Sequence, residues 1–322
     1  MIKYVVKRFI RSIITLLLII SAVFILLRQM PVEGYFNNYE KMTPTQVRVG
    51  LANLGLNKPV HIQLLSFLQD VLKGDLGISN RYRVKYPIVR LIASKMPLSI
   101  EIGLMGLGLG FLLGIPLGIL MARSARSMGR LKIWERFGTV VVVLIQAIPM
   151  SVYALFIQIY GTELMNKITP LPTLFERSKA ITWVLPVFTL SLGAIAFCAL
   201  WIRRYMVDES TKDYVILARA KGVPSFAISR SHIFRNAFVP IVQLIPTMLA
   251  VTLMGSLYVE SRYSVPGMGG LLVDVIKRQD NTVVQVLVLV YSSVSILGLL
   301  LGDIAMAALD PRIRLAGKGE TR

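Results

Sequence analysis

Long uncharged stretches alternate with charged ones along almost the whole chain. About 20 apolar residues are needed to cross the hydrocarbon core of a bilayer as a helix. Five of the uncharged stretches reach that length, and the first reaches it when Phe9 and Ile10 are added, with Arg11 extending back to the interface. The pattern predicts an all-α membrane protein that forms a single domain over residues 1–322. The six predicted transmembrane helices contain the stretches 12–27, 102–122, 137–162, 180–202, 236–259 and 281–302.

A polar insert, residues 203–238, separates the fourth and fifth stretches. From Arg203 to Asn236 it holds seven Lys or Arg and three Asp or Glu. We expect two short helices here. Asp213 suits the N-cap of the first helix, Gly222 suits a left-handed stop after it, and Pro224 is tolerated in the first turn of the second.

One face of the first short helix has the spacing of a docking surface. Tyr214, Leu217 and Ala218 are placed to lie together in a partner's groove. Arg219 and Lys221 fall near the negative end of the same helix. An ordinary cytoplasmic loop whose charges only fix the topology explains the composition equally well. Both interpretations remain open from these features alone.

The distribution of basic residues predicts the orientation of the spans. With the N-terminus inside, the inner segments hold 4, 5, 7 and 4 Lys or Arg, whereas the two short outer loops, 161–181 and 261–280, hold 3 each. The outer loop 31–97 holds 9, but long loops translocate largely regardless of charge. We therefore expect both termini in the cytoplasm.

Composition supports the membrane assignment and argues against nucleic acid as a partner. The chain is 55% hydrophobic with a mean hydropathy of +0.65 and a net charge of +19. Basic loops in a membrane protein set its orientation and favour anionic lipid headgroups. No basic stripe with interleaved aromatic residues, which would indicate nucleic-acid binding, is present.

Two further patterns concern packing outside and inside the membrane. In the outer loop, Val60, Leu64, Phe67, Leu68 and Val71 repeat at helical spacing and are followed by Gly74 and Gly77. This outer helix is either a cap over helix ends or a docking surface. In the second span, glycines recur every four residues and predict close approach to another helix. They are Gly106, Gly110, Gly114 and Gly118, and Gly298 with Gly302 in the sixth span has the same spacing.

Polar side chains within the spans are few. Gln146, Gln158 and Gln243 either line a route for a polar solute or tie helices together. Glu101, Glu260 and Asp303 lie near span ends, where we expect them to reach water. The prolines inside spans predict kinks, and they are Pro116, Pro149, Pro186 and Pro246.

Several kinds of chemistry lack a sequence signal. No Gly-x-x-x-x-Gly-Lys-Ser/Thr motif occurs, so we expect no nucleotide site in this chain. No catalytic constellation is readable in the spans, so we do not expect an enzyme. His61 and His232 lie far apart with no cysteine cluster beside them, which leaves no readable metal site. An ion-coupled transporter or channel acting alone would require ionisable residues in the middle of the spans, and the central thirds of the six stretches have none.

The insert resembles a known element. The residues that carry the resemblance are Asp213-Tyr214, Ala218-Arg219-Ala220-Lys221-Gly222, His232, Arg235-Asn236-Ala237 and Pro240. This pattern is similar to the cytoplasmic coupling loop of ABC-importer permeases, in the version found in the B-type subunit of dipeptide and oligopeptide permeases. The general importer loop carries Glu-Ala-Ala where this chain has Ile216, Leu217 and Ala218. The resemblance therefore implies docking, but not a salt bridge through that glutamate.

The resemblance covers nearly the whole chain and implies a complete transporter. It implies a type I ABC-importer permease fold in a bacterial plasma or inner membrane, with 203–238 as the coupling loop. Partners would be a second homologous permease, two ATP-hydrolysing subunits that bind ATP and Mg, and an extracytoplasmic peptide-binding protein. The chain itself would hold no cofactor. Residues that would dock on the ATP-hydrolysing subunit are Asp213, Tyr214, Leu217, Ala218, Arg219, Ala220, Lys221, Gly222, His232, Arg235 and Asn236.

The cargo is less sharply indicated than the transporter class. The peptide branch implies peptides, but related permeases also import oligosaccharides or metal chelates. The mixed polar and aromatic character of the spans does not separate these cargoes.

Overall fold

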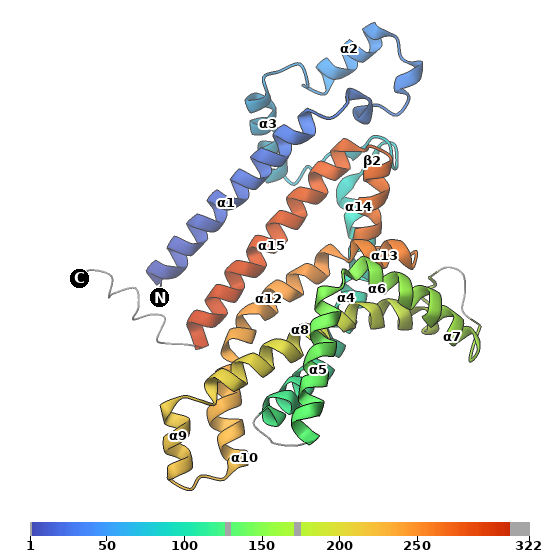
Figure 1. Ribbon diagram of the computed structural model, residues 1–322. Helices are drawn as coiled ribbons and strands as arrows, with labels where there is room; N and C mark the ends of the chain where they lie inside the picture. Colours follow the sequence, from blue (N-terminus) through green and yellow to red (C-terminus); the bar gives the residue numbers. More distant parts are fainter. Residues whose placement is uncertain (1, 126–129, 171–174, 310–322) are drawn as a thin grey trace.

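A computed structural model describes residues 2–125, 130–170 and 175–309, which are mostly helical (Figure 1). Five of its helices are long and apolar enough to cross a membrane, and they correspond to five of the six predicted spans. They are α1 (Ile2–Arg28), α4 (Ile88–Ser124), α8 (Ile181–Glu209), α12 (Val239–Met254) continued by α13 (Leu257–Arg262), and α15 (Asn281–Leu309).

The third predicted span is broken rather than straight. It consists of α5 (Arg130–Ala147) and a second arm that contains α6 (Met150–Phe156), the π-helix η3 (Ile157–Gly161) and α7 (Thr162–Asn166). The two arms are bent by 104° at the break. Pro149 stands directly before α6 with an extended backbone (φ −55°, ψ 138°). A proline disfavours helical geometry in the residue before it, so α5 ends at this point.

The fifth span is interrupted as well, which its uniform apolar sequence did not indicate. Helix α12 ends at Met254, and Gly255 follows with a φ of 70°. A Cβ at Gly255 would lie 2.9 Å from the backbone nitrogen of Gly269 and would collide with the Glu260 carboxylate. Only glycine combines this backbone conformation with so close an approach.

The predicted glycine stripe is the contact between α4 and α8. Gly106, Gly110, Gly114 and Gly118 are all buried in that interface. A Cβ on Gly114 would lie 2.7 Å from the carbonyl oxygen of Ile195, far inside van der Waals contact. Gly298 and Gly302 play the same part between α15 and α12. Because lipid supplies no hydrophobic force between helices, such close backbone packing is what holds them together.

The outer loop is a folded segment that precedes α4 in the sequence. It contains η1 (Val32–Tyr35), η2 (Tyr39–Lys41), α2 (Pro44–Asn53), α3 (Val60–Leu72) and a hairpin of β1 (Ile78–Ser79) with β2 (Tyr86–Pro87). The predicted outer helix is confirmed as α3. It contacts α1, where the rings of Phe24 and Phe67 are 5.6 Å apart.

Asp280 anchors this outer segment to the start of α15. Its side chain is fully buried, and Oδ2 accepts hydrogen bonds from the Ser79 hydroxyl at 2.7 Å and from the backbone N–H groups of Asn80, Arg81 and Tyr82 at 2.9–3.1 Å. The other oxygen, Oδ1, lies 3.4 Å from the N–H of Val283 in the first turn of α15. One carboxylate thus satisfies donors from two segments about 200 residues apart.

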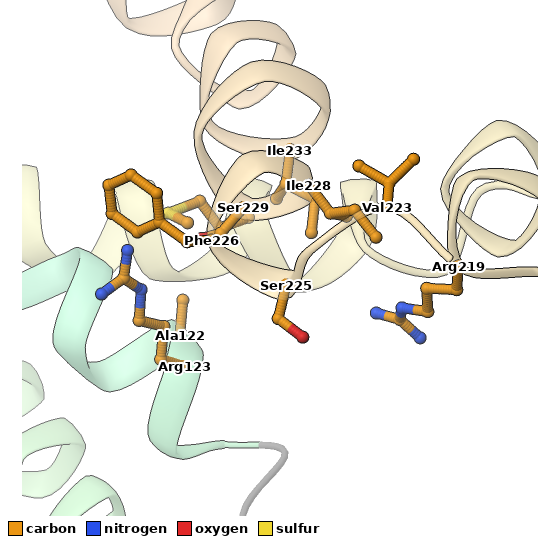
Figure 2. Close-up of a pocket in the computed structure, with 10 residues that line it drawn as sticks. Ala122, Arg123, Arg219, Val223, Ser225, Phe226, Ile228, Ser229 and Ile233 are labelled. Atoms are coloured by element: carbon orange, nitrogen blue, oxygen red, sulfur yellow. The ribbon is translucent and has the colours of Figure 1, made fainter. Parts of the chain in front are cut away.

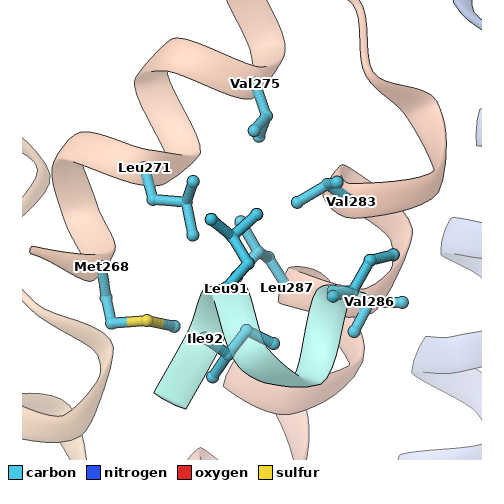
Figure 3. Packing of buried hydrophobic residues seen from close by; sticks show 9 residues of the cluster. Leu91, Ile92, Met268, Leu271, Val275, Val283, Val286 and Leu287 are labelled. Atoms are coloured by element: carbon cyan, nitrogen blue, oxygen red, sulfur yellow. The ribbon is translucent and has the colours of Figure 1, made fainter. Parts of the chain in front are cut away.

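A buried apolar cluster lies beside this anchor (Figure 3). It joins the first turns of α4 to α14 (Met268–Lys277) and to α15. Its members are Ile88, Leu91, Ile92, Met268, Leu271, Val275, Val283, Val286 and Leu287. The first turns of α4 and α15 are therefore packed together with α14 at this end of the bundle.

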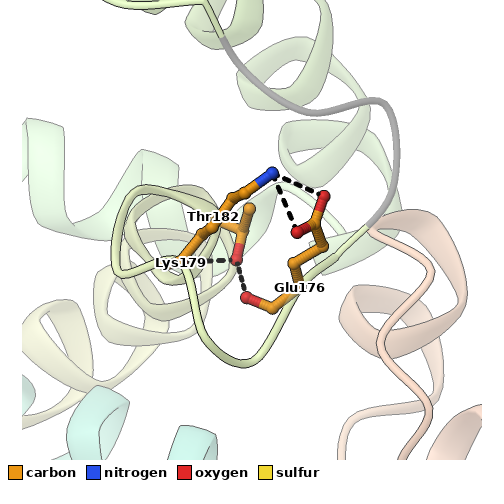
Figure 4. Close-up of polar contacts among 3 residues, drawn as sticks. All are labelled: Glu176, Lys179 and Thr182. Carbon is orange, nitrogen blue, oxygen red and sulfur yellow. Dashed lines mark hydrogen bonds and ion pairs between the residues drawn. The ribbon is translucent and has the colours of Figure 1, made fainter.

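The start of α8 is held by a short polar turn (Figure 4). Lys179 Nζ lies 2.9 Å and 2.8 Å from the two carboxylate oxygens of Glu176, and the Thr182 hydroxyl donates to the carbonyl oxygens of Glu176 and Lys179 at 2.8 Å each. The ion pair is exposed, so its contribution to stability is small. The Thr182 hydroxyl joins this turn to the first turn of α8.

The two ends of the bundle carry different segments. The start of α1, the end of α15 and the coupling loop 203–238 lie at one end, and α2 and α3 lie at the opposite end (Figure 1). This arrangement agrees with the alternation of loops read from the sequence. Which end faces the cytoplasm stays a prediction from the charge distribution.

The glycine contact generates a test of the fold. We expect Gly114→Val to destabilise the protein by about 1–3 kcal/mol, because the new side chain has no room against α8. Gly108→Val is the matched control, since a Cβ on Gly108 meets nothing within 4 Å. Thermal unfolding in detergent measures both. Equal unfolding temperatures for the two variants would contradict the packing described.

Candidate functional site

The coupling loop is a compact helical hairpin at the end of α8. Helix α8 runs on past the uncharged stretch to Glu209, and α9 (Asp213–Ala220) follows after a short turn. The return arm contains α10 (Ser225–Ala227), the π-helix η4 (Ile228–Phe234) and α11 (Arg235–Ala237), and leads directly into α12. The two predicted short helices are present, although the second is partly π-helical.

Gly222 ends α9 in the way the sequence indicates. Its φ is 75°, in the left-handed region. The Gly222 N–H donates to the carbonyl oxygen of Arg219 at 2.9 Å, and the Val223 N–H donates to that of Ala218 at 3.2 Å. This pair of bonds is a Schellman motif, which satisfies carbonyl groups left open at a helix end. The chain reverses at this point and α10 follows.

The start of α9 differs from the prediction. Lys212, with an extended backbone (φ −68°, ψ 146°), is the N-cap residue, and no side chain caps this end of the helix. Asp213 is the first helical residue instead. Its carboxylate still lies at the positive end of the helix dipole, so an acidic residue is favourable there although it does not serve as a cap.

The predicted docking face also needs correction. Ala218 is only 7% exposed and packs, with Val215, against the buried residues Ile202 and Met206 of α8. Leu217 and Ile216 are each 54% exposed. The loop therefore uses Ala218 to attach itself to the bundle. Leu217 and Tyr214 of the predicted face are exposed, and so is Ile216 beside them.

Three predicted residues are joined by hydrogen bonds across the hairpin. The Asn236 side-chain amide donates to the Tyr214 hydroxyl at 2.8 Å and to the carbonyl oxygen of His232 at 3.0 Å. The Tyr214 hydroxyl lies within hydrogen-bonding distance of the Glu209 carboxylate and of the His232 carbonyl oxygen. These contacts tie α9 to the return arm. The other predicted polar positions, Arg219, Lys221 and Arg235, are exposed.

A cavity of about 660 Å³ opens between the loop and the end of α4 (Figure 2). Its apolar wall includes Met206, Ile228 and Ile233, and its hydroxyl groups come from Ser225 and Ser229. Arg123 of α4 and Arg219 of α9 lie on opposite sides of Ser225, and the Arg123 guanidinium points toward the Phe226 ring. Sequence reasoning missed Arg123 and Phe226, because nothing local in the sequence connects the end of the second span to the coupling loop.

Two of the three glutamines form hydrogen bonds to other helices. Gln158 Nε2 donates to the carbonyl oxygen of Arg262 at 2.9 Å, and Gln243 Nε2 lies 3.2 Å from Asp303 Oδ1. Both therefore tie helices together, which is one of the two roles expected. Gln146 is exposed on α5.

The carboxylates near the span ends are more enclosed than predicted. Glu260 is 1% exposed and Asp303 is 8% exposed, so neither reaches water freely. Asp303 pairs with Arg8 of α1. Glu101 pairs with Arg177 and keeps 36% of its side chain exposed. A carboxylate near the end of a span is stabilised when it is paired or hydrogen-bonded, and the ion pairs with Arg8 and Arg177 supply this stabilisation.

Glu260 forms part of a second cavity, of about 470 Å³, between α4, α6, α8, α12 and α13. Its carboxylate accepts hydrogen bonds from the Ser99 hydroxyl at 2.7 Å and from the N–H groups of Gly269 and Gly270 at 2.7 and 3.2 Å. The rest of the lining is mostly apolar, with hydroxyl groups from Thr247 and Thr252. Mostly apolar cavities with a few fixed polar groups are typical of small-molecule sites.

The described residues offer no candidate metal centre. Within 2–125, 130–170 and 175–309, no group of three or more His, Cys, Asp or Glu side chains is placed to hold a metal ion.

Two family models match most of the sequence. "Binding-protein-dependent transport system inner membrane component" matches residues 114–315, and the corresponding N-terminal model matches residues 1–99. The first match includes residues 203–238 and the lining of both cavities except for Ser99, Gly103 and Leu107 of α4.

Two curated relatives are similar over long stretches. The dipeptide transport system permease protein DppB of Lactococcus lactis subsp. cremoris is 32% identical over 315 residues, which cover 98% of this chain and 100% of the relative. The oligopeptide transport system permease protein AmiC of Streptococcus pneumoniae is 37% identical over 221 residues, which cover 67% of this chain and 42% of the relative.

A solved structure shares the fold. A chain of the MetNI methionine ABC transporter, crystallised in an inward-facing conformation, aligns with a TM-score of 0.52 at 18% identity and covers 68% of this chain and 96% of that chain. At this identity the likeness concerns the fold alone. Family models over both parts of the sequence, a full-length relative and a shared fold agree, and the chain belongs to the family of inner membrane components of binding-protein-dependent transport systems.

Proposed function

We propose that this chain is one of two permease subunits of an ATP-binding-cassette importer that takes up peptides delivered by an external binding protein. Partner subunits bind and hydrolyse ATP with Mg, and the coupling loop 203–238 passes their movement to the spans. The names of the relatives, a dipeptide and an oligopeptide permease protein, support peptides as the cargo.

The observation that carries the proposal is the folding of the coupling loop onto the membrane helices. A loop that only set the topology would need no fixed structure. Here Val215 and Ala218 are buried against α8, a Schellman motif turns the chain at Gly222, and Tyr214 bonds to Asn236 across the hairpin. A force applied to the exposed residues Ile216 and Leu217 therefore reaches α8 and α12 without being lost in a flexible segment. Rigid-body movement of packed helices is an established way for such a force to act.

The translocation route in this subunit is proposed to run along the 470 Å³ cavity rather than past the glutamines. Gln158 and Gln243 already use their amides to join helices. The cavity lies where the fifth span is interrupted at Gly255, and its polar groups include Thr252 and Ser256. Broken helices at membrane depth commonly line solute sites in transporters.

Reconstitution tests the function. We expect the purified chain to show no ATP turnover, because it has no phosphate-binding loop. With the second permease, the ATPase subunits and the binding protein in liposomes, ATP should drive uptake of a labelled dipeptide, which unlabelled peptides, but not oligosaccharides or metal chelates, should inhibit. Uptake by this chain alone, driven by an ion gradient, would instead support a secondary transporter.

Thiol labelling tests the orientation. We expect single cysteines at Asn57 and Ser178, in a Cys198→Ala background, to react with an impermeant reagent in intact cells, and one at Ser225 to react only after permeabilisation. All three positions are exposed in the structure, so differences in labelling report the side of the membrane. Labelling at position 225 in intact cells contradicts the predicted topology.

Backbone geometry at Gly222 tests the coupling loop itself. A Cβ there meets nothing within 4 Å, so the cost of a substitution lies in the backbone conformation alone. That cost is about 1–2 kcal/mol and greater for a branched side chain. We expect Gly222→Val to keep normal membrane abundance but to reduce co-purification of the ATPase subunits and transport. Gly222→Asn is the control, because asparagine tolerates this conformation. Full partner retention and uptake by Gly222→Val is the contrary result.

A further inference from the structure

The 660 Å³ cavity beside the coupling loop has an unbalanced positive charge. Two of its ten lining residues are arginines, Arg123 and Arg219, and none of the ten is acidic. Neither arginine belongs to an ion pair formed within the described residues. Glu209, an acidic residue of the same hairpin, is held by the Tyr214 hydroxyl on α9 and does not line the cavity.

The size and lining of the cavity suit several side chains of a partner protein rather than a single ion. Its apolar wall is rigid, since Met206, Ile228 and Ile233 belong to the buried cluster that anchors the loop. Phe226 stands at its edge and is 66% exposed. A volume of about 660 Å³ is much larger than one carboxylate needs. Arginine and aromatic residues around an apolar hollow are characteristic of the energetically dominant part of protein interfaces.

We propose that this cavity receives an acidic segment of the ATP-hydrolysing subunit, with carboxylates that pair with Arg123 and Arg219 and an apolar side chain between them. The proposal rests on the proposed function and adds the chemistry of the partner. In this arrangement the permease offers a cavity to the ATP-hydrolysing subunit in addition to the exposed face of α9. The end of α4 then becomes part of the docking surface. Arg123, which the sequence indicated only as one of the basic residues that set the orientation, thereby gains a second role.

Electrostatics favour this occupant. A guanidinium covered by a partner loses its water, so the partner must supply a compensating carboxylate. Arginine is suited to this because its planar group binds a carboxylate through two parallel hydrogen bonds. The Ser225 and Ser229 hydroxyls, which also line the cavity, add hydrogen-bond donors to it.

Charge reversal in the assembled transporter tests the proposal. We expect Arg123→Glu and Arg219→Glu each to weaken retention of the ATPase subunits about tenfold or more, measured by titrating ATPase subunits onto permease pairs in nanodiscs. Both side chains are exposed, so membrane abundance should not change. Arg230→Glu is the matched control, because it makes the same charge change on the same hairpin outside the cavity. Arg→Gln variants at 123 and 219 should also flatten the salt dependence of binding.

The possible results distinguish a failure of the cavity proposal from a failure of the proposed function. If the wild type binds no ATPase subunit, the proposed function fails. If the wild type binds and both reversals bind equally well, the cavity proposal fails alone. If Arg230→Glu weakens retention of the ATPase subunits as much as the other reversals do, overall loop charge governs docking, and the cavity proposal is overturned. Loss of co-purifying anionic lipid from the arginine variants, with ATPase binding intact, assigns the cavity to a lipid headgroup instead.

Discussion

The close approach of α4 and α8 is the contact on which the rest of this structure depends. Four glycines on α4 let the helix backbones meet, and in lipid such contact replaces the hydrophobic force that holds soluble helices together. The same two helices continue toward the coupling loop. Ala122 at the end of α4 and Ile202 and Met206 on α8 form part of the cluster that supports α9. A side chain between the two helices would therefore disturb the site as well as the fold.

Ion pairs and side-chain hydrogen bonds near the ends of the spans link helices far apart in the sequence. Arg8 and Asp303 join α1 to α15 across 295 positions, and Gln243 adds α12 to the same group. Arg203 Nε donates to Glu135 at 2.6 Å and fastens α5 to α8. Charges in these pairs compensate one another, which removes much of the cost of burying them. Their positions are explained by assembly of the bundle.

The features that could be predicted from the sequence are periodic or local. Uncharged stretches locate the spans, a four-residue glycine repeat indicates the α4–α8 contact, and Gly222 marks the end of α9 because its neighbours on both sides have readable preferences. The missed features depend on distant partners. The 104° bend at Pro149 was expected only as a kink, since the size of a turn is set by what packs around it. The burial of Ala218 and the presence of Arg123 at the coupling loop depend on how α8 and α4 meet, which no local pattern records.

The π-helical stretch η4 determines which face of the return arm is aligned with the buried face of the fifth span. The buried residues along the return arm are Ile228, Ile233, Ala237 and Ile241, so the first step is five residues and the following steps are four. In a regular α-helix each residue turns the chain by about 100°, so a step of five residues would place Ile233 on a different face from Ile228. The wider turn absorbs the additional residue. One continuous apolar seam therefore runs from the return arm into α12, so this arm of the hairpin and the membrane helix share one buried face.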